Sequence, residues 1–261
     1  MILTSYQFSA AGGRVKNEDC VRTARRGASR CFVLCDGLGG HAGGDLASQC
    51  VCDAMETAFL TGDERVPMAR RMERAVLQSQ AALLERQRAG GIQNGMRTTL
   101  CCLMLSENDV AAAFVGDSRI YQFRGGRALA HTSDHSVSQQ LVRIGEIRQE
   151  DVRRHEDRST LLRSMGEPWE TPQYELWTQL ERVQSGDAFL LCSDGLWEWV
   201  EEADMEHDLA EADGPRAWAE AMCARVAARE AIHAIDNYSL IAVWVQAGDS
   251  AAACAKNGEP L

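Results

Sequence analysis

Acidic residues stand at the ends of apolar runs in this chain. Six share such positions or a nearby loop: Glu18, Asp19, Asp36, Asp117, Asp194 and Asp236. Glycine lies next to Asp36, Asp117 and Asp194, where it lets the backbone turn sharply and approach another group closely. Because strand ends in a layered fold can meet at one edge, these carboxylates are candidates for a shared site.

Carboxylates that converge repel one another and raise each other's pKa values. Divalent cations remove this repulsion, and oxygen ligands suit magnesium or manganese. The six histidines form no HExxH or similar array, so zinc is the weaker choice. A single aspartate after a strand is usually a turn residue or a helix cap, and that role stays open for each position taken alone.

The apolar runs that carry these residues are typical of strands, because many contain β-branched or aromatic residues and end at Gly, Asp or Asn. We expect strands at 2–9, 31–35, 98–105, 110–115, 119–123, 174–178, 188–192 and 239–245. Gly125-Gly126 indicates a hairpin turn. Helical patterns cover 45–60, about 67–88, 136–144 and 215–232. Helices grouped between runs of strands indicate α+β layers rather than alternating β–α units.

The composition narrows the class of protein. The 261 residues are 45% hydrophobic and 25% charged, which is enough to build a sizeable core. A net charge of −11 argues against nucleic acid as the main partner. No signal-peptide pattern and no apolar run of about 18 residues is present, so we expect a cytoplasmic protein without membrane insertion. Ten cysteines without a CxxC pair are expected to be mostly buried free thiols.

Eight fragments occur in an order and spacing that resemble a known family. They are GRVKNEDC, FVLCDGLGGHAGG, TTL, AAFVGDSRIYQFRGG, SDHSVSQQLVRIGEI, LLRSMG, GDAFLLCSDGLWEWV and DNYSLIAVWV. The chain resembles the metal-dependent protein phosphatases, the type 2C Ser/Thr phosphatases, in their compact bacterial form over residues 6–245. The resemblance implies a central sandwich of two antiparallel sheets flanked by helix pairs. It also implies one catalytic domain over residues 1–247, with a flap at about 136–165. The Ala-, Gly- and Asp-containing composition of residues 248–261 predicts a disordered tail.

The resemblance also implies the role of each site residue. Two tightly bound Mn²⁺ or Mg²⁺ ions would be held by Glu18, Asp36, the Gly37 carbonyl, Asp194 and Asp236. Asp36 would bridge them, and Asp117 with Asp194 would hold a third, weaker ion. Arg14 would grip the phosphate with its planar fork. Asp19 and Asn237 would support the ligands. The paired metals would activate a water that attacks phosphorus in line, without a phosphoenzyme.

The sequence departs from the family pattern at a position that matters for proton transfer. Many members carry His directly after the first Asp-Gly, where this chain has Leu38. Leucine cannot donate a proton, so His41 or a metal-bound water is left as the general acid, and His41 could equally be a loop residue. Arg97 stands directly before the Thr98-Thr99 pair, where bacterial members often have Gly, and Ser239 replaces a usual Thr. Trp169 is a candidate for substrate contact beside the flap.

Two other functions are less favoured. Cys20–Arg26 and Cys223–Arg229 have the Cys-x5-Arg spacing of cysteine phosphatases, but lack the glycines and the preceding His of such a loop. An inactive scaffold on the same fold would have lost ligand carboxylates, and here every one is present. We therefore expect a monomeric Ser/Thr phosphatase that acts on phosphorylated proteins, targets of a cognate Ser/Thr kinase and the kinase itself.

Overall fold

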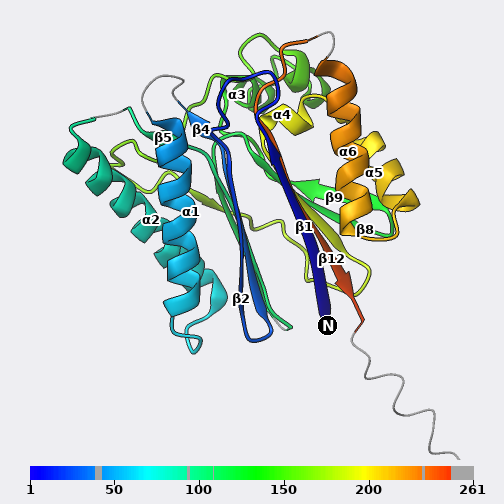
Figure 1. Cartoon of the computed structure of the whole chain (residues 1–261), viewed down its shortest axis with the longest axis horizontal. Coiled ribbons are helices and arrows are strands. Elements are labelled where there is room, and N and C mark those ends of the chain that lie inside the picture. The colour runs from blue at the N-terminus through cyan, green and yellow to red at the C-terminus, as the bar shows by residue number, and fades with distance from the viewer. Residues whose placement is uncertain (39–42, 93–94, 108, 231–232, 248–261) are drawn as a thin grey trace, which may run out of the picture.

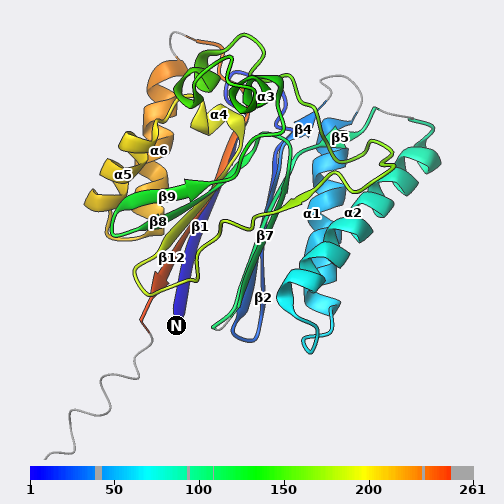
Figure 2. The ribbon, with the colours of Figure 1, turned by 180° about the vertical axis from the view of Figure 1, so that it is seen from behind.

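Two five-stranded antiparallel sheets face each other in the computed structural model, which describes residues 1–38, 43–92, 95–107, 109–230 and 233–247. Helices cover the outer side of each sheet (Figures 1 and 2). This arrangement confirms the expected sandwich of two antiparallel sheets between helical layers.

The first sheet has the strand order β1-β12-β11-β8-β9. Its strands are β1 (Ile2–Ala10), β8 (Arg119–Arg124), β9 (Arg127–His131), β11 (Ala188–Cys192) and β12 (Tyr238–Gln246). β1 pairs with β12 over their whole length, and this joins the two ends of the domain. β8 and β9 form the hairpin expected from Gly125-Gly126.

The second sheet has the order β10-β7-β6-β3-β2. Its strands are β2 (Cys20–Arg26), β3 (Ser29–Cys35), β6 (Leu100–Leu105), β7 (Val110–Val115) and β10 (Glu175–Leu176). A separate pair, β4 (Gly37–Leu38) with β5 (Arg97–Thr98), lies at the end of this sheet.

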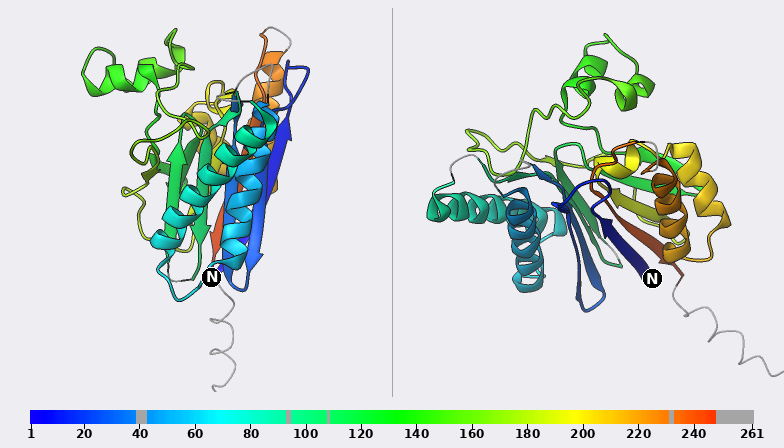
Figure 3. Two further views of the ribbon diagram at one scale, coloured as in Figure 1. Left: turned by 90° about the vertical axis from the view of Figure 1, so that its left-hand side faces the viewer. Right: turned by 45° about the horizontal axis from the view of Figure 1, so that its top comes forward.

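The helices divide between the two faces. α1 (Gly44–Thr61) and α2 (Met68–Gly90) pack on the second sheet, and α4 (Asp194–Trp197), α5 (Glu202–Glu211) and α6 (Pro215–Glu230) on the first. α3 (Val137–Arg143) and a short 3₁₀ helix, η1 (Gln149–Arg154), belong to the flap segment, residues 136–165. This segment stands out from the sandwich in Figure 3, where it is green.

The core has three apolar layers, one between the sheets and one beneath each set of helices. In β3, Phe32 and Leu34 face the opposite sheet, whereas Cys31, Val33 and Cys35 face α1 and α2. A strand buried on both faces is apolar at every position, which explains the continuous run that identified it. The cysteines of the described residues are free and mostly buried, as expected.

Several element boundaries differ from expectation. The expected strand 98–105 is divided at Thr99, which leaves β5 and β6 as separate strands. Only two residues of 174–178 are a strand. β2, α4, α5 and η1 were not anticipated. β2 is an edge strand with three arginines, and these polar positions obscure the apolar pattern of a strand.

Candidate active site

A cavity of about 500 Å³ lies at the end of the sandwich that the flap overhangs. It is lined by Gly13, Arg14, Val15, Lys16, Glu18, Asp36, Gly37, Leu38, Asp117, Ser159, Asp194, Asp236 and Asn237. β3 and β7 of one sheet and β11 of the other end here, one or two residues before three of these aspartates. Stacking of the sheets therefore brings residues distant in sequence into one site.

Nearly all the predicted site residues line this cavity. Asp19 is not part of the cavity lining, but its carboxylate accepts a hydrogen bond from Ser193, next to Asp194. His41 belongs to 39–42, outside the described residues.

The Asp36 backbone is fixed by two threonines. Its N–H donates to Thr99 Oγ1 at 2.9 Å, and its carbonyl accepts from Thr99 N–H and Thr98 Oγ1, both at 2.8 Å. At the next residue, a Cβ on Gly37 would lie 2.3 Å from the Gly44 carbonyl and 2.6 Å from that of Glu18. Glycine is required here because two other backbones pass too close for a side chain.

Asp19 and Ser193 link the carboxylates of the two sheets. Ser193 Oγ donates to Asp19 Oδ2 at 2.9 Å and accepts from Ser239 N–H at 2.9 Å. Ser193 also precedes Asp194, the first residue of α4. Asp19 Oδ1 is buried and has no hydrogen-bond partner within the described part of the chain.

Asn237 holds the loop that carries Arg14 and Glu18. Its Oδ1 accepts from Glu18 N–H at 2.8 Å, and its Nδ2 donates to the Ala11 and Lys16 carbonyls, both at 2.9 Å. Arg14 extends from this loop to Asp236, with Nη2 and Oδ2 2.7 Å apart.

Four aspartates at the site, Asp19, Asp36, Asp117 and Asp194, have raised pKa values. Burial, with the charges of Asp19 and Asp194, raises the pKa of Asp36 well above its ordinary value. Burial raises the pKa of Asp194 to about 7 and that of Asp19 to about 6. The pKa of Asp117 is also raised well above its usual range, by burial and then by Asp194. A group of carboxylates that cannot all ionise is chemically suited to bind cations.

The donor set fits hard divalent ions, because it consists of carboxylate and carbonyl oxygens. No three Asp, Glu, His or Cys side chains of the described residues are already arranged as one ion cage. Instead, Asp236 is engaged by Arg14, and Ser193 holds one oxygen of Asp19. Asp19 Oδ1 has no partner among the described residues, so this buried oxygen is available to an ion or a water.

Some features of the site were not anticipated from sequence. Ser159 reaches the cavity from the flap, and no motif marked it. Leu38 does line the cavity, at the position where many relatives carry His. Trp169 does not belong to the cavity wall: it packs against the core beside α2 and donates from Nε1 to the Ser164 carbonyl. Arg97 forms an ion pair with Glu167 at 2.7 Å.

The family model for protein phosphatase 2C matches residues 12–238. The chain belongs to this family. It is a metal-dependent Ser/Thr phosphoprotein phosphatase, a hydrolase, as the motifs had indicated. No helix in the described ranges is long and apolar enough to cross a membrane.

Similar proteins are known from several bacteria. The serine/threonine phosphatase Stp of Listeria monocytogenes is 36% identical over 183 residues, which are 68% of this chain and 70% of that protein. The crystal structure of the Mycobacterium tuberculosis phosphatase PstP has a TM-score of 0.82 at 28% identity, and the match covers 95% of this chain and 100% of that one. A PstP catalytic domain solved with two manganese ions has a TM-score of 0.77 at 27% identity and covers 94% and 99% of the two chains.

Proposed function

We propose that this type 2C phosphatase hydrolyses phosphoserine and phosphothreonine in targets of a Ser/Thr kinase, with two Mn²⁺ or Mg²⁺ ions in its cavity. The supporting observation is that the oxygen ligands expected from sequence share one cavity wall with Arg14. Glu18, Asp36, the Gly37 carbonyl, Asp194 and Asp236 would hold the ions. When bound, the ions would supply an activated water for in-line attack on phosphorus.

Arg14 would orient the phosphoryl group. Its side chain is 63% exposed and its guanidinium already binds one carboxylate, so it can exchange this contact for phosphate oxygens. Asp19, Ser193 and Asn237 would keep the ligand-bearing segments in place through their hydrogen bonds.

Asp117 would hold a third, weaker ion together with Asp194. It is 3% exposed and faces the same cavity. Because Leu38 cannot donate a proton, the leaving alkoxide would take its proton from His41 or from water at this third position. Replacing His41 by Ala would separate these donors, since a basic leaving group such as phenolate depends more on the acid than p-nitrophenolate does.

We infer a monomeric cytoplasmic enzyme, with residues 1–247 as its catalytic domain, that reverses the phosphorylation of target proteins and of the cognate kinase itself.

The metal mechanism is tested with Asp36→Asn. An amide is a poor bridging ligand, so the purified variant should be folded but inactive on a phosphothreonine peptide. EDTA should silence the wild type, and added manganese should restore its activity. Asp53→Asn is the matched control and should stay active, because Asp53 lies on α1 outside the cavity, where it is exposed and paired with Arg22 of β2. Full activity of EDTA-treated Asp36→Asn would refute the proposal.

A further inference from the structure

His135 binds both polar groups of the Gly116 backbone. The backbone N–H of His135 donates to the Gly116 carbonyl at 2.9 Å, and the ring atom Nδ1 accepts from Gly116 N–H at 3.2 Å. Gly116 is the first residue after β7 and directly precedes Asp117. The residue before this cavity aspartate is therefore held by one histidine from another segment.

The ring of His135 is enclosed. It is 2% exposed and is stacked on Phe114, with ring centroids 4.9 Å apart. Nε2 lies 3.2 Å from Glu175 Oε1 and 3.3 Å from Arg163 Nη1. Because Nδ1 accepts a hydrogen bond, a neutral ring must carry its proton on Nε2, and this proton can only go to Glu175. Arg163 also binds Glu175, at 2.7 Å.

The neutral form of the ring is consistent with its surroundings. Burial and the charge of Arg163 lower the pKa of His135 to about 4. At neutral pH, Nδ1 therefore keeps the lone pair that Gly116 requires.

Gly116 is confined on its other side as well. It has φ of 100°, and a Cβ would lie 2.7 Å from Thr99 Cγ2. Further along the same turn, Trp197 Nε1 donates to the Asp117 carbonyl at 2.9 Å. The Asp117 backbone is thus held at both its preceding residue and its own carbonyl.

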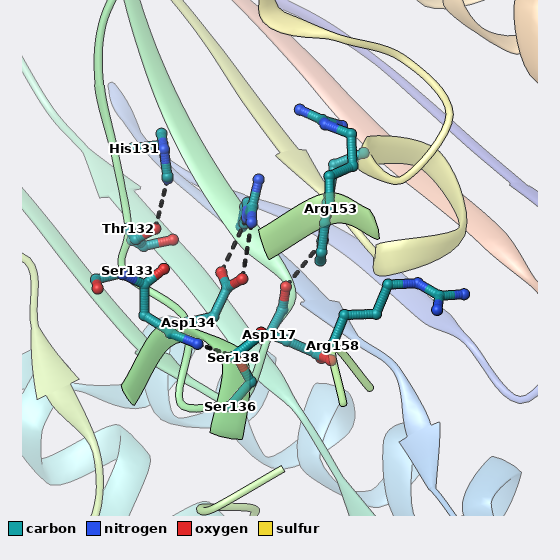
Figure 4. Close-up of polar contacts among 12 residues, drawn as sticks. Asp117, His131, Thr132, Ser133, Asp134, Ser136, Ser138, Arg153 and Arg158 are labelled. Carbon is teal, nitrogen blue, oxygen red and sulfur yellow. Dashed lines mark hydrogen bonds and ion pairs between the residues drawn. The ribbon is translucent and has the colours of Figure 1, made fainter. Parts of the chain in front are cut away.

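His135 also lies where the two ends of the flap segment meet. Its carbonyl accepts from Leu162 N–H at 2.8 Å, and Ser136 and Leu161 form a β-bridge. The preceding residue, Asp134, makes a buried two-point ion pair with Arg119, with distances of 2.9 and 2.8 Å. Figure 4 shows Asp134 and Asp117 close together in this region.

We propose that His135 is a positioning residue: through Nδ1 it fixes the Gly116–Asp117 turn and so joins the base of the flap to the site of the weaker ion. This inference rests on the function proposed for Asp117. It does not make His135 an acid, a base or a metal ligand.

Two substitutions separate the two ring nitrogens. Asn places an oxygen near the position of Nδ1 and can accept from Gly116, whereas Gln extends toward Nε2 and can reach only Glu175. His135→Gln leaves a buried N–H without a partner, which is costly enough to displace the turn, so kcat should fall about tenfold or more. His135→Asn should keep kcat within about threefold of wild type, because the acceptor is retained. His207→Gln, on an exposed residue of α5, is the control.

A readout independent of turnover uses the metal-free protein. Nitrogen-15 NMR should show the Nε2-protonated tautomer of His135 in the wild type. The Gly116 amide should be protected from exchange in wild type and His135→Asn but not in His135→Gln. A wild-type ring protonated on Nδ1, or Gln preserving kcat better than Asn, would overturn the inference. If the NMR results hold but Asp117→Asn is fully active, the contact is real and the proposed role of Asp117 is wrong.

Discussion

Arg14 stands at the mouth of the cavity with most of its side chain exposed, although it binds a candidate metal ligand. Burial lowers the proton affinity of an arginine, but here the hydrogen bond and charge of Asp236 prevail and raise the pKa of Arg14. The residue stays cationic at any pH at which the enzyme works, and its fork is available to a phosphoryl group.

Replacing Arg14 by Ala should mainly raise KM. A charge-assisted, two-point contact contributes about 1.5–3 kcal/mol, so kcat/KM for p-nitrophenyl phosphate should fall about 10- to 100-fold. Arg14→Lys keeps the charge but not the planar guanidinium, so its kcat/KM should lie between those of the wild type and Arg14→Ala. Steady-state kinetics at saturating manganese measure this, and unchanged constants in Arg14→Ala would leave the residue a purely structural role.

Asp117 can be separated from the tight ion sites in the same way. Asp117→Asn leaves Glu18, Asp36, Gly37 and Asp236 intact, so two manganese ions should remain bound after dialysis. Its kcat should still fall strongly, with KM changed less, because the lost interaction acts in the transition state. Metal analysis and kinetics on the same sample decide this. Two retained ions with wild-type turnover would reduce Asp117 to a turn residue.

At the scale of elements, α2 is connected to the active site by buried glutamines. Gln87 Nε2 donates to the carbonyls of Met96 and Gly166, at 2.7 and 2.8 Å. Met165, next to Gly166, pairs with Thr98, which in turn holds the Asp36 carbonyl. The helix thus supports both the end of the flap and the segment that fixes Asp36.

Gln87→Leu should therefore destabilise the protein. It leaves two buried carbonyls without this donor, at a cost of about 2 kcal/mol, or a Tm lower by about 4–8 °C. Gln78→Leu is the matched control, since Gln78 is exposed on the same helix and its loss should shift Tm little. Thermal unfolding measures both. Equal Tm values for the two variants would show that the hydrogen bonds of Gln87 do not contribute to stability.

At the scale of the whole molecule, burial in the metal-free protein disfavours the ionised forms of Asp194 and Asp19, and neighbouring carboxylates add to this. Asp194 and Asp19 have folded pKa values of about 7 and about 6, above the unfolded value of about 3.9. As pH falls from about 7 toward 4, the folded state takes up protons that the unfolded chain does not, so these groups add stability. That contribution is lost as pH rises through the folded pKa values.

Manganese competes with those protons, so its stabilising effect should grow with pH. At about 100 times the dissociation constant, a bound ion contributes about 2.7 kcal/mol, which corresponds to a Tm increase of about 5–10 °C. The increase should be larger at pH 7.5 than at pH 5.5, because binding must displace fewer protons. Thermal scans with EDTA and with manganese at both pH values measure this increase in Tm. The titration of His135 affects both scans at a given pH equally, so it cancels in their difference. A smaller increase at the higher pH would contradict the competition.

The sequence alone determined the strands that are buried on both faces and the residue types of the site. β3, β7 and β11 are continuous apolar runs that end at aspartates, so local composition marks both the strand and its functional end. The ordered motifs identified the family and predicted that Arg14 and the carboxylates that line the cavity belong to one site. The edge strand β2 was not predicted from the sequence, because its exposed positions are polar and rich in arginine. The interruption between β5 and β6 was not predicted either, because it depends on the hydrogen bond between Thr99 and Asp36, 63 residues away.

Only the tertiary structure decided how these residues support one another. Asn237, 219 residues from Glu18, binds its backbone, and Ser193 joins Asp19 to the opposite sheet. The structure also shows that His135 satisfies both polar groups of Gly116, and that Trp169, half-buried, packs against the core outside the cavity wall. Such contacts depend on the stacking of two sheets and the return of the flap. Their partners are distant in sequence, and no local pattern or spacing encodes which atoms will meet.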